Sequence, residues 1–568
     1  MTATDMVVRC AGEAGDGIIT LGDIFVKAYV RMGLSVFTFR SYPTEVRGGN
    51  VMYQIRVSAN QALSQGDKVD ILVAFNRKEM ESHIDSLAPG GILILDQGIA
   101  PPPGRADKAL YVPLSQLSQG FGQERRNIVM LGFLARYLGM EEAVVRGIIG
   151  GRFAKREELL RHNIGAFKVG WEYCALKAWL YERPLRMVGT AQQRLLMSGN
   201  EAMVLGAIAA GCRFFAGYPI TPASEILEYM AEVLPRFGGN VLQVEDEMAA
   251  LASVIGASFV GTKAMTATSG PGFSLMGELI GFASMAEIPC VIVDSQRVGP
   301  STGIPTSTEQ SDLLLAIHAS HGESPRIVLA PSTVEECFSL TMDAFNLSEA
   351  YQLPVIILSD LALSHRLEAV PPFDPSKAMV VDRMTPMAEV DDTFMRFKVT
   401  ETGVSVMPIP GSSGIYAAMG IEHDEKGFPG YTPEIRLRMT EKRFGKLDHV
   451  VTHKFIRTFG DPEAPIGIIG WGSTEGAIIE AVDTLAKEGI SVQGLQLKML
   501  CPLPKEELAA FAEGKKAIVV AELNHNGQCA SLLKSDMGLE TKSIRKYVGL
   551  PFTAGELVER LRGVIQVA

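Results

Sequence analysis

The sequence lacks any long hydrophobic run. No apolar stretch among its 568 residues reaches the roughly 18 to 20 residues that a membrane-spanning helix needs. The first residues, MTATDMVVRC, contain no basic region followed by a hydrophobic block, so we expect no secretory signal and predict a cytoplasmic protein without membrane contact. Lysine and arginine form no cluster and the net charge is -11, so no nucleic-acid partner is expected.

Cysteines are few and scattered. No two of the seven form a CxxC pair, so we expect neither an iron-sulfur cluster nor a zinc site built by this chain alone. The seven are Cys10, Cys174, Cys212, Cys290, Cys337, Cys501 and Cys529. His318, His321 and His525 lack the spacing of metal ligands and are expected to be ordinary loop residues, so no metal site is predicted.

What the sequence does contain is a repeated α/β pattern. Hydrophobic residues make up 47% and charged residues 21%, which is typical of a globular protein. Short apolar runs alternate with helical stretches, which predicts a multidomain α/β protein with doubly wound parallel sheets. We expect α/β domains over residues 1–186, 195–370 and 461–568. Residues 371–460, rich in Pro, Gly and charge, are expected to be an irregular bridging segment.

Two of the chemically informative segments follow strands of the second domain. Thr268-Ser269-Gly270-Pro271-Gly272 ends a strand and opens a helix, where backbone N–H groups favour a phosphate or a carboxylate, although a purely structural turn has the same pattern. In Gly217-Tyr218-Pro219-Ile220-Thr221-Pro222, the Thr221 hydroxyl could cap a helix or face the crevice at the carboxyl end of the sheet.

The same domain offers carboxylates and an arginine. Glu245, Asp246 and Glu247 precede a helix of small residues, where they either complement the helix dipole or include one buried functional carboxylate. Arg297 follows the strand VIVDSQ and precedes a loop rich in glycine and serine. It could bind a carboxylate bidentately, or be a surface residue.

A Gly-Asp-Gly turn lies near the N-terminus, at Gly15-Asp16-Gly17. A magnesium-diphosphate site built on such a turn also needs an Asn about 25 to 30 residues later, and the nearest, Asn50, comes too late. We therefore expect Asp16 to be no metal ligand. It is expected in a glycine turn that opens a helix, where an anionic group such as that of coenzyme A could dock.

Together these segments resemble one family. GYPITPASEI, QVEDEMAALASVIGAS, TATSGPGFSLMGE, DSQRVGPSTGIPT and GIEHDEKG are similar to the alpha subunit of 2-oxoacid:ferredoxin oxidoreductases, in particular the 2-oxoglutarate type. GEAGDGIITLG and RSYPTEVRGGN resemble the gamma domain that this type carries fused ahead of its alpha subunit. The resemblance covers nearly the whole chain. It implies a gamma domain, a thiamine diphosphate pyrimidine-binding domain and a domain like the C-terminal domain of transketolase.

The resemblance also implies roles for the site residues. Glu247 matches the glutamate that hydrogen-bonds the N1′ atom of the coenzyme's pyrimidine ring and thereby promotes removal of the C2 proton; Glu245 and Asp246 are its rivals. Thr221 matches a threonine that contacts the substrate, and Arg297 is where we place the carboxylate clamp. The residues assigned to coenzyme binding beside Glu247 are Tyr218, Pro219, Ile220, Ser269 and Gly270.

The implied partner is a beta subunit that carries the diphosphate and Mg²⁺ site and a [4Fe-4S] cluster, in an (alpha-beta)2 heterotetramer. The implied reaction is the reversible oxidative decarboxylation of 2-oxoglutarate to succinyl-CoA and CO2, with coenzyme A as co-substrate and ferredoxin as electron acceptor. The chain departs from the family at Gly403-Val404-Ser405-Val406-Met407, where many relatives have Ser-Pro-Arg. Pyruvate or a broad range of 2-oxoacids therefore stays an alternative, as does a non-catalytic scaffold.

Overall fold

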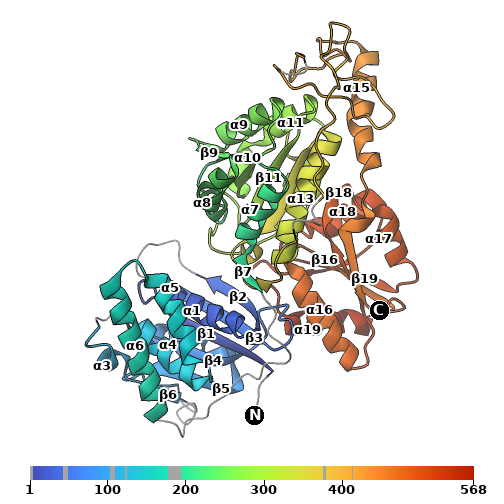
Figure 1. Cartoon of the computed structure of the whole chain (residues 1–568). Helices are drawn as coiled ribbons and strands as arrows, with labels where there is room; N and C mark the ends of the chain where they lie inside the picture. The colour runs from blue at the N-terminus through green and yellow to red at the C-terminus, as the bar shows by residue number, and fades with distance from the viewer. Residues whose placement is uncertain are drawn as a thin grey trace. The chain divides into compact units, whose positions relative to one another are not determined.

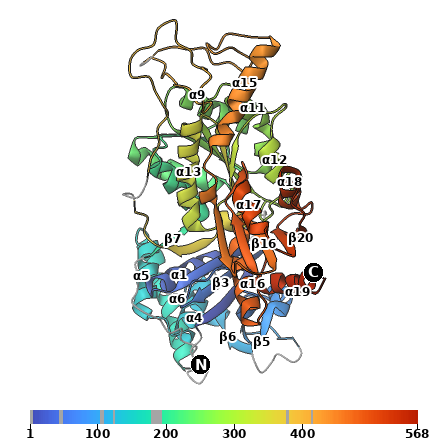
Figure 2. The ribbon, with the colours of Figure 1, turned by 90° about the vertical axis from the view of Figure 1, so that its right-hand side faces the viewer.

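A computed structural model of the chain describes residues 4–41, 49–102, 109–121, 125–176, 194–374, 379–411 and 414–567. Figures 1 and 2 show the ribbon from two sides. The chain divides into two compact units. Unit 1 comprises Met1–Met197, Arg366–Pro372 and Thr553–Glu556, and unit 2 comprises Ser198–His365, Phe373–Phe552 and Leu557–Ala568. The expected end of the first domain, residue 186, lies outside the described residues.

Unit 1 is built on an eight-stranded sheet in the order β6-β5-β4-β1-β3-β2-β14-β7. Its strands are β1 (Asp5–Glu13), β2 (Ser35–Ser41), β3 (Asn50–Ser58), β4 (Val69–Ala74), β5 (Leu87–Asp96), β6 (Ala109–Val112), β7 (Leu195–Ser198) and β14 (Leu367–Val370). Its helices are α1 (Ile18–Arg31), α2 (Arg77–His83), α3 (Leu114–Leu117), α4 (Arg126–Tyr137), α5 (Glu142–Phe153) and α6 (Glu157–Leu176).

Only half of this sheet is parallel. β1, β4, β5 and β6 are parallel neighbours, as expected from sequence. β3 instead runs antiparallel to β1 and β2, with Cys10 opposite Tyr53, which differs from the expected doubly wound parallel sheet. The alternation of buried and exposed residues identifies a strand but does not set its direction, which depends on the connection before it.

Unit 2 contains a seven-stranded sheet in the order β18-β12-β13-β11-β10-β8-β9. The strands from β9 to β12 in this order are all parallel, and β18 adds an antiparallel edge. These strands are β8 (Phe214–Gly217), β9 (Asn240–Gln243), β10 (Ala264–Thr268), β11 (Cys290–Gln296), β12 (Ile327–Leu329), β13 (Pro354–Asp360) and β18 (Met499–Cys501). The accompanying helices are α7 (Gly199–Ala209), α8 (Ser224–Val233), α9 (Glu247–Phe259), α10 (Gly270–Leu275), α11 (Gly277–Met285), α12 (Leu313–His318), α13 (Val334–Tyr351) and α14 (Leu361–Ser364).

The last part of the chain forms a five-stranded sheet in the order β15-β17-β16-β19-β20. Its strands are β15 (Ile456–Gly460), β16 (Ile466–Trp471), β17 (Gln493–Leu497), β19 (Ala517–Glu522) and β20 (Lys542–Arg545), with helices α16 (Glu475–Lys487), α17 (Lys505–Ala512), α18 (Gln528–Met537) and α19 (Ala554–Val567). One apolar core joins both sheets of unit 2, because Trp471 and Leu495 pack in the same cluster as Ile292 and Ile356.

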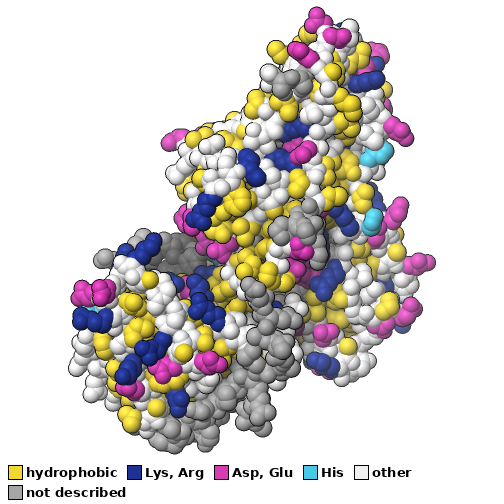
Figure 3. All heavy atoms as spheres, in the orientation of Figure 1, with side chains coloured by type: hydrophobic (Ala, Val, Ile, Leu, Met, Phe, Trp, Pro, Cys, Tyr) yellow, Lys and Arg dark blue, Asp and Glu magenta, His cyan; other side chains and the backbone are white. Residues whose placement is uncertain are grey.

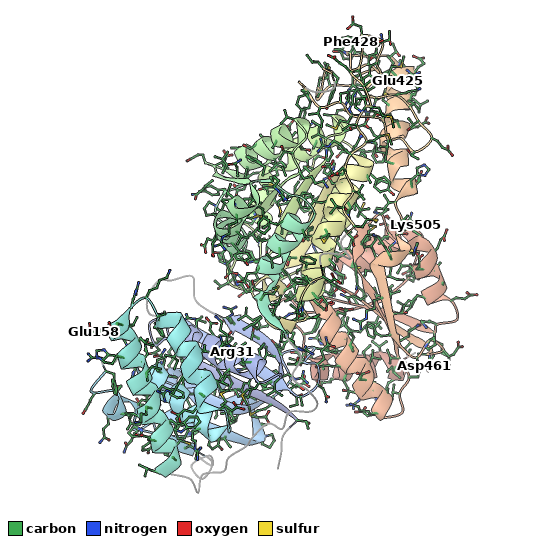
Figure 4. The ribbon with its side chains drawn as sticks, viewed as in Figure 1. Arg31, Glu158, Glu425, Phe428, Asp461 and Lys505 are labelled. Atoms are coloured by element: carbon green, nitrogen blue, oxygen red, sulfur yellow. The ribbon has the colours of Figure 1, made fainter. Side chains whose placement is uncertain are left out.

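Along the chain, a segment that we call the arm, residues 379–451, follows the seven-stranded sheet's strand β13 and precedes β15 of the five-stranded sheet. Most of the arm is irregular, and it also contains α15 (Pro433–Gly445). In both ribbon views α15 extends beyond α11, and Glu425 and Phe428 lie at its far end (Figures 1, 2 and 4). On the visible face of unit 2, apolar side chains alternate with charged side chains of both signs (Figure 3).

The base of the arm is fixed by a buried ion cluster. Lys442 and Lys446 both contact Glu287, at 2.6 and 2.5 Å, and all three side chains are fully buried. Arg396 donates to the backbone carbonyl of Glu287 at 2.9 Å. The lysines lower the pKa of Glu287 against the opposing effect of burial, and burial lowers the pKa of Lys446 to about 7. Within the described part of the chain, no helix is long and apolar enough to cross a bilayer.

Candidate active site

The candidate site lies at the carboxyl edge of the seven-stranded sheet. β9 and β10 lie on opposite sides of β8, so the chain reverses direction across the sheet there, and such a switch point opens a crevice above the strand ends. Because β8, β9, β10 and β11 are parallel, the segments that follow them emerge at one edge. These segments begin at Tyr218, Val244, Ser269 and Arg297, and they carry all the site residues predicted from sequence.

The three acids after β9 have three different environments. Asp246 is the N-cap of α9, and its Oδ1 accepts a hydrogen bond from the Ala249 N–H at 2.7 Å. Glu245 is exposed, whereas Glu247 is only 5% exposed. Burial of a carboxylate at the first residue of a helix is costly unless it has a partner, so Glu247 is the acid whose position calls for a functional reason.

The Glu247 carboxylate lies against the turn between β10 and α10. A Cβ atom built on Gly272 would be 2.3 Å from Glu247 Oε1 and 2.2 Å from Thr268 Oγ1, so only glycine fits there. Ser269, the N-cap of α10, is fully buried, and its hydroxyl has no hydrogen-bond partner among the described residues. The crevice therefore combines the buried carboxylate of Glu247 with the buried hydroxyl of Ser269, which has no hydrogen-bond partner among the described residues.

Arg297 is buried, not a surface residue. It is 7% exposed, and its Nη1 donates to the Thr221 carbonyl at 2.7 Å while Nη2 donates to the Thr302 carbonyl at 3.1 Å. Its Nε is buried without a partner among the described residues, and burial lowers its pKa. Arg297 thus joins the segment after β8 to the loop after β11, and its Nε–H remains available to hydrogen-bond a ligand.

The segment after β8 does not cap its helix with Thr221. The N-cap of α8 is Ala223, which offers no side-chain cap, and Thr221 is half-buried. Tyr218 and Pro219 are exposed at the crevice edge and Ile220 is half-buried. The capping alternative for Thr221 is therefore wrong, while its predicted contact with substrate stays a prediction.

Two buried acids beside these residues were not predicted from sequence. Asp294 on β11 is fully buried, and neither of its carboxylate oxygens has a hydrogen-bond partner in the described chain. Asp312 lies just before α12, and its Oδ2 would be 2.7 Å from a Cβ atom on Gly270. The sequence signal was an acid inside the apolar strand CVIVDSQ, where charged residues are rare.

The loop after Arg297 is held by the last domain of the chain. Gln310 donates to the Trp471 carbonyl at 3.0 Å and accepts from the Leu523 N–H at 3.1 Å, and Asn524 donates to the Gln310 carbonyl at 3.0 Å. The segment AELNHNGQ, residues 521–528, therefore packs within unit 2. His525 is exposed with its ring edge-on to Tyr547, and no metal-ligand cluster occurs among the residues that the structure describes.

In unit 1, Asp16 lies in the expected glycine turn that opens α1. Gly15 and Gly17 have φ of 108° and 73°, which favours glycine, and α1 begins at Ile18. Asp16 Oδ2 accepts from the Glu13 N–H at 2.9 Å, and Oδ1 pairs with Arg126 at 2.8 Å. Most of RSYPTEVRGGN, residues 42–48, lies outside the described part of the chain, and coenzyme A docking at this turn stays a prediction.

Comparison with protein families places this geometry in a class. Residues 205–442 match the family pyruvate flavodoxin/ferredoxin oxidoreductase, thiamine diphosphate-binding, which covers the whole crevice. Residues 7–173 match pyruvate ferredoxin/flavodoxin oxidoreductase, and residues 464–555 match core domain II of pyruvate:ferredoxin oxidoreductase. The fold and site thus define a thiamine diphosphate-dependent oxidoreductase, as the sequence predicted.

Full-length relatives identify the family. Subunit alpha of 2-oxoacid:ferredoxin oxidoreductase 1 from Aeropyrum pernix is 31% identical over 99% of this chain and 98% of its own. The 2-oxoglutarate oxidoreductase subunit KorA from Mycobacterium tuberculosis is 31% identical over 99% and 92%. A solved 2-oxoglutarate:ferredoxin oxidoreductase from Magnetococcus marinus, with 2-oxoglutarate, coenzyme A and succinyl-CoA bound, is 38% identical with a TM-score of 0.93 and covers 99% of both chains. The chain belongs to the 2-oxoacid:ferredoxin oxidoreductase alpha subunits.

Proposed function

We propose that the chain is the alpha subunit of a 2-oxoglutarate:ferredoxin oxidoreductase. In the proposed reaction, 2-oxoglutarate and coenzyme A give succinyl-CoA and CO2, and two electrons pass to ferredoxin. The likeness to the Magnetococcus marinus enzyme supports this substrate, because it extends over 99% of both chains and that enzyme was solved with 2-oxoglutarate and succinyl-CoA bound.

The crevice fits the aminopyrimidine half of thiamine diphosphate. A carboxylate that is 5% exposed and a fully buried hydroxyl without a partner suit the nitrogen atoms of such a ring. When bound, the coenzyme supplies the carbon nucleophile that makes decarboxylation of a 2-oxoacid possible. We assign Glu247 to the ring nitrogen N1′, Ser269 and Gly270 to the ring's surroundings, and Tyr218–Ile220 to the crevice edge.

Within this site Glu247 is assigned the hydrogen bond to the ring nitrogen N1′. Burial beside Thr268 and Gly272 keeps bulk water from its carboxyl group, so a hydrogen bond to a ring nitrogen is strengthened. Arg297 and Thr221 bind the substrate: the unpartnered Nε of Arg297 supports a role in holding a carboxylate, and Thr221 lies next to it through its own carbonyl.

The other half of the coenzyme site is assigned to a partner. The alpha-subunit names of the relatives support a multi-subunit enzyme, and the seven cysteines form no CxxC pair. We propose that a beta subunit binds the diphosphate with Mg²⁺ and carries the [4Fe-4S] cluster, in an (alpha-beta)2 assembly. Coenzyme A is the acyl acceptor.

Steady-state rates of the assembled complex with ferredoxin test the substrate. We expect kcat/KM to be highest for 2-oxoglutarate, below it for 2-oxobutyrate and lowest for pyruvate. Comparable values for all three would instead favour a broad-range enzyme. Wild-type turnover after Glu247→Gln would favour the scaffold alternative.

A further inference from the structure

A pair of acids lies directly behind the candidate substrate site. Asp294 is opposite Thr268 in the register of β11 with β10, one residue before Ser269, and it is fully buried without hydrogen bonds to described residues. Asp312 reaches the same turn, with Oδ2 in the space that a Gly270 side chain would need. The Asp312 N–H is held by Gln296 Oε1 at 3.0 Å, which fixes the residue beside β11.

The charges around this pair do not balance. Arg297 is the cation that acts on Asp312, while Glu309 from the same loop adds negative charge. β10 (AMTAT) and α10 (GPGFSL) contain no charged residue, and the acid Glu247 of α9 lies against Gly272. Asp360 at the end of β13 faces the loop through Thr308 and Gln310. The single positive charge of Arg297 cannot compensate two ionised carboxylates at Asp294 and Asp312.

Burial and mutual repulsion therefore keep one proton on the pair near neutral pH. Burial and then the charge of Asp312 raise the pKa of Asp294 well above its usual range, so Asp294 is neutral. Burial and Glu309 raise the pKa of Asp312 to about 6, and Arg297 opposes that rise. Asp312 is thus the member that still ionises at pH 7, and Arg297 is what keeps it charged.

We propose that Asp312 takes up a proton when the substrate carboxylate binds Arg297, so that 2-oxoacid binding is coupled to proton uptake at the Asp294–Asp312 pair. This rests on the proposed role of Arg297. An anion at the guanidinium cancels the charge that stabilises ionised Asp312 and adds a repulsive neighbour, so protonation of Asp312 relieves both effects. Asp312 acts through Arg297 and is a positioning residue, not a catalytic one.

Calorimetry on the assembled complex tests the coupling. The probe is 2-hydroxyglutarate, which has the carboxylates of 2-oxoglutarate but no keto group to react. Binding heats at pH 7 in phosphate and in Tris give the number of protons taken up, because the two buffers differ in ionisation enthalpy. We expect an uptake approaching one proton per ligand, with affinity rising up to tenfold per pH unit as pH falls from 7.5 towards 6.

Two variants test whether Asp312 is the residue that takes up the proton. Asp312→Asn preserves the shape and should abolish the uptake, whereas the control Glu228→Gln, at an exposed acid of α8, should retain it. Absence of uptake in the wild type, which needs no variant, would overturn the inference, as would unchanged uptake in Asp312→Asn. If the complex turns over pyruvate and not 2-oxoglutarate, the proposed substrate fails separately, and the same proton count is made with lactate.

Discussion

Replacing Gly272 by Ala perturbs the proposed site through two known contacts. The new Cβ would lie 2.3 Å from Glu247 Oε1 and 2.2 Å from Thr268 Oγ1, where 3.4–4 Å is ordinary contact. Thr268, the last residue of β10, can relieve its own contact only by turning its hydroxyl, and the Glu247 side chain must also yield. Its carboxylate must move by about 1 Å, and a displacement of that size costs on the order of 10²-fold in rate.

The assay is kcat with 2-oxoglutarate and ferredoxin in the assembled complex, together with thermal unfolding. We expect kcat to fall about 10²-fold and stability to fall by about 1–3 kcal/mol from overpacking. Gly256→Ala is the matched control, because it lies on the same helix as Glu247 with nothing within 4 Å of its Cβ. It should leave kcat unchanged and stabilise the helix by about 0.5–1 kcal/mol. Wild-type kcat in a folded Gly272→Ala complex would refute the reasoning.

Four further predictions concern buried groups. Glu247→Gln should lower kcat by about 10²–10⁴-fold without changing the melting temperature, measured in the assembled complex. Glu287→Gln should destabilise the chain by about 3–5 kcal/mol in urea unfolding, because it leaves buried cations unpaired, whereas Lys446→Met should not. Since burial lowers the folded-state pKa of Lys446 to about 7, the unfolded chain binds more protons above that pH, so stability should rise from pH 7 to pH 9, and less steeply in Lys446→Met. Gln310→Ala should cost about 2–5 kcal/mol because the Leu523 N–H and Trp471 carbonyl lose their partner, which a lower urea midpoint would reveal.

The sequence predicted the parallel core of the second domain well. The runs that became β8, β9, β10 and β11 end in the segments that carry the site, and parallel strands necessarily bring those ends to one edge. The sequence left Glu245 and Asp246 as rivals of Glu247, and the structure separates the three because Asp246 caps α9 with its side chain bound to the backbone.

What sequence could not supply were contacts between distant segments. The antiparallel insertion of β3 depends on the path of the chain, not on its apolar pattern. Glu287 meets Lys442 across 155 residues, and no local feature of either segment predicts the other. In the sequence, Asp294 is a single acid in an apolar strand. Its pairing with Asp312 could not be predicted, because only the fold brings Asp312 to the same turn.

The central claim is that this chain binds only the pyrimidine half of the coenzyme site, with Glu247 in the crevice, and that a partner supplies the rest. The most direct test is the thiamine diphosphate, magnesium and iron content of the purified 61.3 kDa chain, alone and after assembly with a cysteine-containing beta subunit. The account predicts that the chain alone retains none of the three and that the complex contains all of them. Stoichiometric coenzyme and magnesium on the isolated chain would contradict it.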